Sequence, residues 1–75
     1  MYMVIEMQLN DGHLAYLATV HETLAAAEQK YHQILSAAAV SQVDAHSAVI
    51  LDARGVPWKN ETYDHTQEGG EDDAE

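Results

Sequence analysis

Hydrophobic and polar residues alternate along the first part of this chain. In residues 2–9 every second position is apolar, and this apolar side consists of Met3, Ile5, Met7 and Leu9. A period of two predicts a β-strand with one apolar side. Asn10-Asp11-Gly12 comes next, and Asp-Gly favours the positive φ angles of a tight turn. Alternation resumes from His13 to Thr19, so residues 2–19 predict a β-hairpin.

The stretch from Thr23 to Ser41 instead has the period of an α-helix. Good helix formers dominate it, and it contains neither Gly nor Pro. Thr23 is the expected N-cap, in preference to Thr19, which forms a competing capping box with Glu22. No Gly marks the end of the helix, so its start is better defined than its stop. The apolar residues fall on one stripe roughly 100° wide, as a helix lying on a core requires: Leu24, Ala27, Tyr31, Ile34, Leu35 and Ala38.

Two further strands are expected after the helix. Residues 46–52, HSAVILD, contain three consecutive apolar residues, which is typical of a strand that lies inside a sheet and is covered on both faces. Gly55 suits a turn, and residues 56–63 predict a fourth strand. Pro57 lacks an N–H, so it should stand where that strand begins or where the bond faces outward. Residues 1–65 thus form one domain, and the acidic residues 66–75 predict a disordered tail.

The resulting order, β-β-α-β-β, predicts an α+β fold in which one helix packs on one face of a four-stranded antiparallel sheet. The second face of that sheet stays uncovered and is expected to be apolar in part. The residues on it depend on which side of each strand takes the helix: Met3, Ile5 and Met7 or Tyr2 and Val4 in the first strand, and Val49 and Leu51 or Ala48 and Ile50 in the third. An apolar face on so small a chain favours a partner, and we predict a homo-oligomer, with a dimer as the first expectation.

Charge is unevenly distributed along the 75 residues. The formal net charge is −10, of which −3 falls on residues 1–60 and −7 on residues 61–75. This balance argues against nucleic-acid binding, which needs a basic surface. The chain has no Cys, shows no signal-peptide pattern and has no apolar run of membrane-spanning length. We therefore expect a protein of the cytosol, with no membrane partner.

Three segments together resemble a family of short uncharacterised proteins encoded by bacteriophages and prophages. The segments are AEQKYHQILSAAAVS (27–41), HSAVILDARG (46–55) and ETYDH (61–65), and the similarity extends over residues 1–65. Relatives often have Cys and Lys on either side of the closing Tyr, where this chain has Thr62 and Asp64. The resemblance implies a viral or mobile-element origin, with the host cytosol as the location, and it implies no activity. The positions that match the family pattern are Glu28, Tyr31, His32, His46, Tyr63 and His65.

Histidine is frequent, with five residues in the chain, and three of them join one carboxylate as weak candidate metal ligands. Imidazole and carboxylate groups suit zinc or nickel. The candidates are Glu28, His32, His46 and His65. Their spacing fits no standard metal motif, and the alternative interpretation is that Glu28 and His32 pair at i, i+4 while His46 stands at a strand start. The sequence assigns no metal and no cofactor.

No catalytic motif is visible, because the chain lacks a nucleophilic Cys, a Gly-x-Ser-x-Gly sequence and a phosphate-binding loop, and we predict that it is not an enzyme. The pattern favours a small structural or interaction protein. One alternative is an anti-defence inhibitor or a nucleotide-sequestering protein that uses Arg54, Trp58 and Lys59, and a second is a histidine-based metal-binding protein. The residues that these hypotheses assign to a ligand or partner are Tyr31, His32, His46, Arg54, Trp58, Lys59 and Tyr63.

Overall fold

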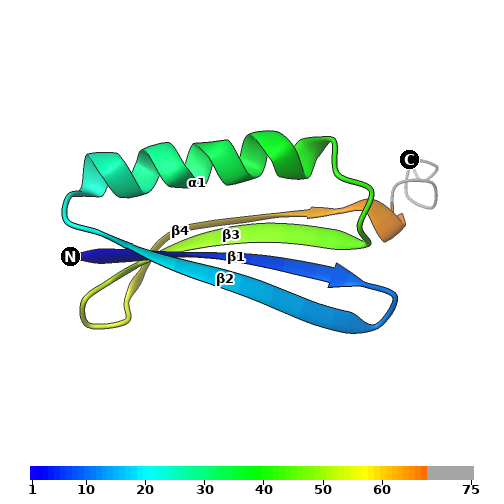
Figure 1. The fold of residues 1–75 in the computed structure, drawn as a ribbon, viewed down its shortest axis with the longest axis horizontal. Helices are drawn as coiled ribbons and strands as arrows, with labels where there is room; N and C mark the ends of the chain where they lie inside the picture. The colour runs from blue at the N-terminus through cyan, green and yellow to red at the C-terminus, as the bar shows by residue number, and fades with distance from the viewer. Residues whose placement is uncertain (68–75) are drawn as a thin grey trace.

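The computed structural model describes residues 1–67 and has the predicted order of elements. These are β1 (Tyr2–Asn10), β2 (His13–His21), α1 (Leu24–Ala39), β3 (Ala45–Asp52), β4 (Pro57–Asp64) and the 3₁₀ turn η1 (His65–Gln67). The strands form one antiparallel sheet in the order β2-β1-β3-β4. Helix α1 lies along one face of this sheet, and none of the other labelled elements covers the opposite face (Figure 1). The predicted α+β fold is confirmed.

Local sequence signals account for the first hairpin and for the start of the helix. Asp11 and Gly12 have φ angles of 56° and 80°, so the two-residue turn is of the type I′ that Asp-Gly favours. Thr23 is the N-cap, since its Oγ1 accepts a hydrogen bond of 3.1 Å from the backbone N–H of Ala26. The helix ends at Ala39, two residues before the predicted end. No glycine cap is needed there, because the backbone N–H of the C-cap residue bonds back to the last turn.

The core forms between the helix and the two central strands. Small residues on both sides let the helix approach the sheet closely, and the core residues are Val4, Ala27, Tyr31, Ile34, Ala48 and Ile50. Val4 and Ile50 are the largest side chains that are fully buried. Because side chains alternate across a strand, this arrangement turns Met3, Ile5 and Met7 away from the helix. The uncovered face therefore carries the side of β1 that alternation marked as apolar.

The second hairpin differs from an ideal pair at one position. β3 lies between β1 and β4, as predicted for an interior strand, but only one of its faces is covered by the helix. Pro57 opens β4, as its missing N–H requires. The register shifts between Ile50 and Leu51, where Trp58 is the extra residue on β4.

Thr66 belongs to η1, so the described structure extends past the predicted domain boundary at residue 65. Residues 68–75 of the predicted tail lie outside the described residues.

Candidate functional site

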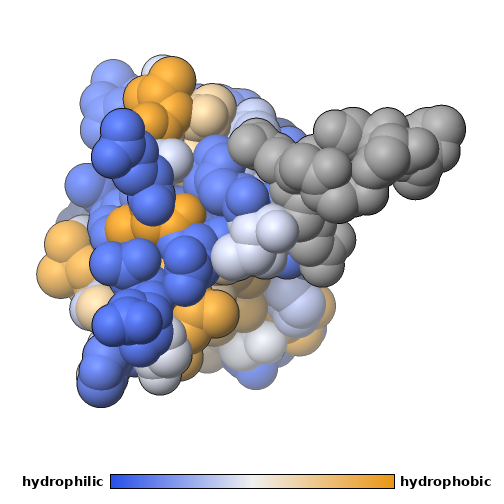
Figure 2. Space-filling view, turned by 90° about the vertical axis from the view of Figure 1, so that its right-hand side faces the viewer, coloured by the Kyte–Doolittle hydropathy of each residue, from blue (hydrophilic) through white to orange (hydrophobic). Residues whose placement is uncertain are grey.

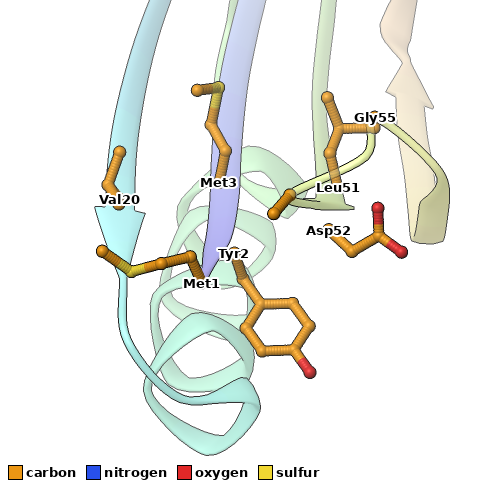
Figure 3. Close-up of a pocket in the computed structure, with 8 residues that line it drawn as sticks. Met1, Tyr2, Met3, Val20, Leu51, Asp52 and Gly55 are labelled. Atoms are coloured by element: carbon orange, nitrogen blue, oxygen red, sulfur yellow. The ribbon is translucent and has the colours of Figure 1, made fainter.

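The side of β1, β2 and β3 that points away from α1 forms one continuous surface, the open face. Strand register and alternation place on it Met3, Ile5, Met7, Leu9, Leu14, Tyr16, Ala18, Val20, Ala45, Ser47, Val49 and Leu51. Every member is uncharged, and all but Ser47 are largely apolar. Figure 3 shows Met3, Val20 and Leu51 on the near side of the sheet with the helix behind it. On β4 the same side of the sheet becomes polar, at Asn60 and Thr62, and is charged at Asp64.

The surface at one end of the molecule is unlike the open face. At the end of the molecule that holds the C-terminus of α1, apolar residues are separated from one another by polar ones (Figure 2). Scattered apolar residues are normal on a protein surface, whereas a continuous set is the mark of an interaction site. The open face is therefore the strongest candidate site by its chemistry.

A shallow hollow of about 240 Å³ lies at one end of the open face (Figure 3). Its lining includes Met3, Val20 and Leu51 from three strands and Gly55 from the β3–β4 turn. This volume is below the range of roughly 300–1,000 Å³ that is usual for small-molecule sites. The hollow is better suited to receive one side chain than a whole ligand.

Asp52 organises the β3–β4 turn next to this hollow. Its carboxylate accepts hydrogen bonds from the backbone N–H groups of Arg54 and Val56, at 2.8 and 3.0 Å, and from the indole N–H of Trp58 at 3.2 Å. The guanidinium of Arg54 adds an ion pair of 3.2 Å. The N–H of Val56 is the main cause that holds the pKa of the Asp52 carboxyl well below its usual range. Burial opposes this effect, and the hydrogen bonds from Trp58 and Arg54 add to the lowering. Trp58 also meets Tyr2 edge to face, with ring centroids 5.7 Å apart.

Of the three residues suggested for nucleotide capture, Arg54 and Trp58 share one partner, Asp52, whereas Lys59 has a different one. Arg54 pairs with Asp52 in the turn, and its side chain is 81% exposed. Lys59 lies on the helix side of the edge strand β4, where its Nζ is 3.1 Å from the Oε2 of Glu28. A positive pocket would need both cations free to face one anion, and each is already paired with a carboxylate. Glu28 bonds Lys59, so its expected i, i+4 pair with His32 is not the contact that the structure has.

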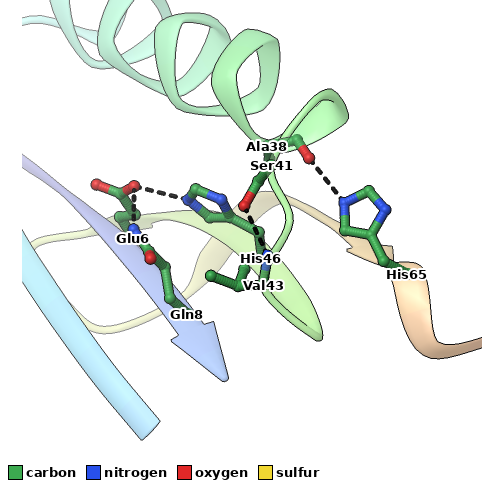
Figure 4. A network of polar contacts seen from close by, with 7 residues as sticks. All are labelled: Glu6, Gln8, Ala38, Ser41, Val43, His46 and His65. Atoms are coloured by element: carbon green, nitrogen blue, oxygen red, sulfur yellow. Dashed lines mark hydrogen bonds and ion pairs between the residues drawn. The ribbon is translucent and has the colours of Figure 1, made fainter. Parts of the chain in front are cut away.

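His46 lies beneath α1, paired with a residue that the sequence did not single out. Its Nε2 is 2.7 Å from the Oε2 of Glu6, and the Nε2 of Gln8 donates to the same oxygen at 3.2 Å (Figure 4). His46 is 4% exposed, and its Nδ1 is buried without a hydrogen-bond partner among residues 1–67. His46 is the second residue of β3, as expected for a residue at a strand start, and its imidazole is in addition part of a buried polar pair. Alternation could have indicated Glu6, since it is the only charged position within the first strand.

The remaining candidates form two separate ring contacts, one of Tyr31 with His32 and one of Tyr63 with His65. Tyr31 is a buried core residue, and burial, with a smaller contribution from the charge of Glu61, raises the pKa of its hydroxyl. His32 is exposed and meets Tyr31 edge to face. His65 stacks on Tyr63, and its Nε2 is 3.0 Å from the carbonyl oxygen of Ala38 (Figure 4). Within residues 1–67 no three His, Cys, Asp or Glu side chains are grouped closely enough to hold a metal ion.

Comparisons with known proteins find no relative of this chain. No protein-family model matches the chain, and no curated protein or solved structure is similar enough to count as a match. The resemblance to phage and prophage proteins therefore stays a prediction. In the part of the chain that the structure describes, no helix has the length and apolar character needed to cross a membrane.

Proposed function

We propose that this protein is a small interaction module that self-associates through its sheet, with the open face of one copy packed on the open face of another. The observation that carries the proposal is the continuous, uncharged, apolar character of that face opposite the helix. Burying such a surface gains the hydrophobic free energy of about 25 cal/mol per Å² and desolvates no charge.

The size of the open face sets the scale of this contact. Three strands spaced about 4.8 Å apart, each of about eight residues at 3.3 Å per residue, give roughly 400 Å² per copy. Two copies would bury about 800 Å², which is the size of a weak, concentration-dependent interface. Sheets of this kind pack face to face about 10 Å apart, with interdigitated side chains.

The charge distribution favours a second copy as the occupant. The chain has a formal net charge of −10, so two copies repel each other at most orientations. The open face lacks charged residues on β1, β2 and β3, and contact there brings no acidic side chains together. The small core also fits, because domains of this size commonly gain stability by association.

Light scattering after gel filtration tests the proposal on the full-length chain. Ile5 stands in the middle of the open face, opposite Ala18 on β2 and Val49 on β3. The Ile5→Lys variant should have a lower solution mass than the parent protein, and Gln29→Lys, on the exposed side of α1, should not change the mass. A parent protein that is monomeric at every concentration, or an Ile5→Lys variant of unchanged mass, would overturn the proposal. Circular dichroism confirms that each variant is folded.

A further inference from the structure

The two edge strands of the sheet differ in how they resist pairing with another chain. β4 has the usual protections, namely Pro57, a bulge at Trp58, and the charged residues Lys59 and Glu61. β2 has none of these: its sequence, HLAYLATVH, contains no Pro and no Asp, Glu, Lys or Arg. It pairs with β1 over nine residues without a bulge, so its outer edge is long and regular.

β2 carries large, exposed apolar side chains on both faces, although its helix-side face also holds the polar residues His13, Thr19 and His21. Leu14, Tyr16 and Val20 on the open face are 66%, 74% and 60% exposed, and Leu17 on the helix side is 57% exposed. Helix α1 leaves Leu17 uncovered because it lies over the two central strands. A strand that is apolar on both faces normally lies inside a sheet, as β3 does. β2 has the composition of an interior strand at an edge position.

The outer edge of β2 offers a defined set of backbone groups. Asn10 and His13 flank the two-residue turn and form its hydrogen-bonded pair. Bonded and non-bonded pairs alternate along an antiparallel ladder, so the odd-numbered residues of β2 bond to β1. The even-numbered residues therefore direct their N–H and C=O groups away from the sheet, and these residues are Leu14, Tyr16, Ala18 and Val20.

We propose that β2 pairs antiparallel with β2 of a second copy about a twofold axis at Leu17, which joins two sheets into one. The strand is nearly self-complementary about this residue. Leu14 meets Val20, the large Tyr16 meets the small Ala18, and Leu17 meets Leu17. In this register the four residues of each strand whose N–H and C=O groups point away from the sheet pair with one another, which gives about eight backbone hydrogen bonds. Apolar cross-strand pairs add stability on both faces.

Charge and shape favour a second copy over a foreign strand. The acidic residue nearest to the axis is Glu6, which stands opposite Leu17 on β1. Its carboxylate is bonded to His46 and its side chain is only 20% exposed, so β2 separates it from the second copy. A hollow of about 200 Å³ lies beside the axis on the helix side, and its lining residues are Glu6, Gln8, Ala15, Tyr16 and Leu17. Leu17 of the second copy is placed to enter this space. The edge contact does not require the open-face contact, because it is made by the outward-pointing backbone groups of β2 and by the pairing of Leu17 with Leu17 at the axis.

Single cysteines test the register directly, since the chain has no Cys of its own. Two residues on the axis form a non-bonded pair with Cα atoms about 4.5 Å apart, a separation that a disulfide accepts. Leu14 would stand about 20 Å from Leu14 of the second copy. Under mild oxidation, the full-length Leu17→Cys variant should form a covalent dimer at least about tenfold faster than the matched Leu14→Cys variant, which links only by chance collision. Equal rates in the two variants, or no dimer from either, would overturn the register.

A charge pair at the axis gives a second test. Leu17→Lys and Leu17→Glu should each lose the edge contact, because like charges would stand opposite each other. Mixing the two variants should restore it, as measured by solution mass. If Leu17→Lys keeps the mass of the parent protein while Ile5→Lys lowers it, the edge pairing is wrong and the proposed function stands. If Leu17→Lys lowers the mass while Ile5→Lys does not, the open-face contact is wrong and the edge pairing stands.

Discussion

The Nε2 of His46 lies 2.7 Å from the Oε2 of Glu6, and the two residues are forty positions apart in the chain. The contact joins β1 to β3 on the face that α1 covers. His46 is almost fully buried, whereas the Glu6 side chain is 20% exposed, so solvent reaches the carboxylate and not the ring. A polar group this deep in a small core is held in place by its one strong partner.

Removing that partner should destabilise the protein. In Glu6→Ala the buried N–H of His46 would have no acceptor, and the free energy of unfolding should fall by about 1–3 kcal/mol. Urea denaturation followed by circular dichroism measures the change. Glu22→Ala, which removes an exposed carboxylate outside the strands, should stay within about 0.5 kcal/mol of the parent protein. Equal losses in both variants would contradict the special role of Glu6.

Protonation of Asp52 should weaken the fold in acid. Its folded-state pKa is depressed, so its contribution to stability is complete above the unfolded-state pKa of about 3.9 and is lost as the pH falls toward the lower folded-state value. Asp52→Asn should therefore melt at a lower temperature than the parent protein at pH 7, and the difference should shrink below about pH 4. A difference that stays constant from pH 7 to about pH 2 would contradict this explanation. Glu61→Gln serves as an exposed control.

Short-range sequence signals were enough to predict most of the fold. The Asp11-Gly12 turn, the Thr23 cap and the position of Pro57 each depend on a few neighbouring residues, and each is confirmed. Alternation also located the strands to within about two residues. These features follow from the conformational preferences of the residues themselves.

Long-range relationships could not be read in the same way. Both sides of β1 and β3 contain apolar residues, so alternation alone could not show that Val4 faces the helix and Ile5 faces away. The choice depends on how small residues such as Ala48 let the helix approach. The Glu6–His46 pair depends in turn on the strand register, and the bulge at Trp58 depends on the pairing of β4 with β3. None of these is a local property.

Two glycines occupy backbone conformations that other residues avoid. Gly12 and Gly55 have φ angles of 80° and 84°, and a Cβ at either position would meet no atom within 4 Å. Alanine should therefore cost only the backbone strain, about 1–2 kcal/mol of unfolding free energy at each site. Gly12→Asn should lose less than Gly12→Ala, because Asn tolerates the left-handed region better. A stabilising effect of Gly12→Ala in urea denaturation would contradict the positive φ angle.

The Glu28–Lys59 ion pair connects the first half of α1 to the edge strand β4. Both side chains are partly exposed, at 35% and 45%, so their coupling should be small, about 0.2–1 kcal/mol. A double-mutant cycle with Glu28→Gln and Lys59→Met, measured by urea denaturation at low salt, gives this coupling energy.

A matched cycle with Gln29→Ala and Lys59→Met should show no coupling energy, because Gln29 is one position further along the helix and turned to solvent. Raising the salt concentration to about 1 M should remove most of the coupling, because the Debye screening length at that concentration is about 3 Å. A coupling energy that salt does not change would mean that the aliphatic part of Lys59, and not its charge, holds the helix to β4.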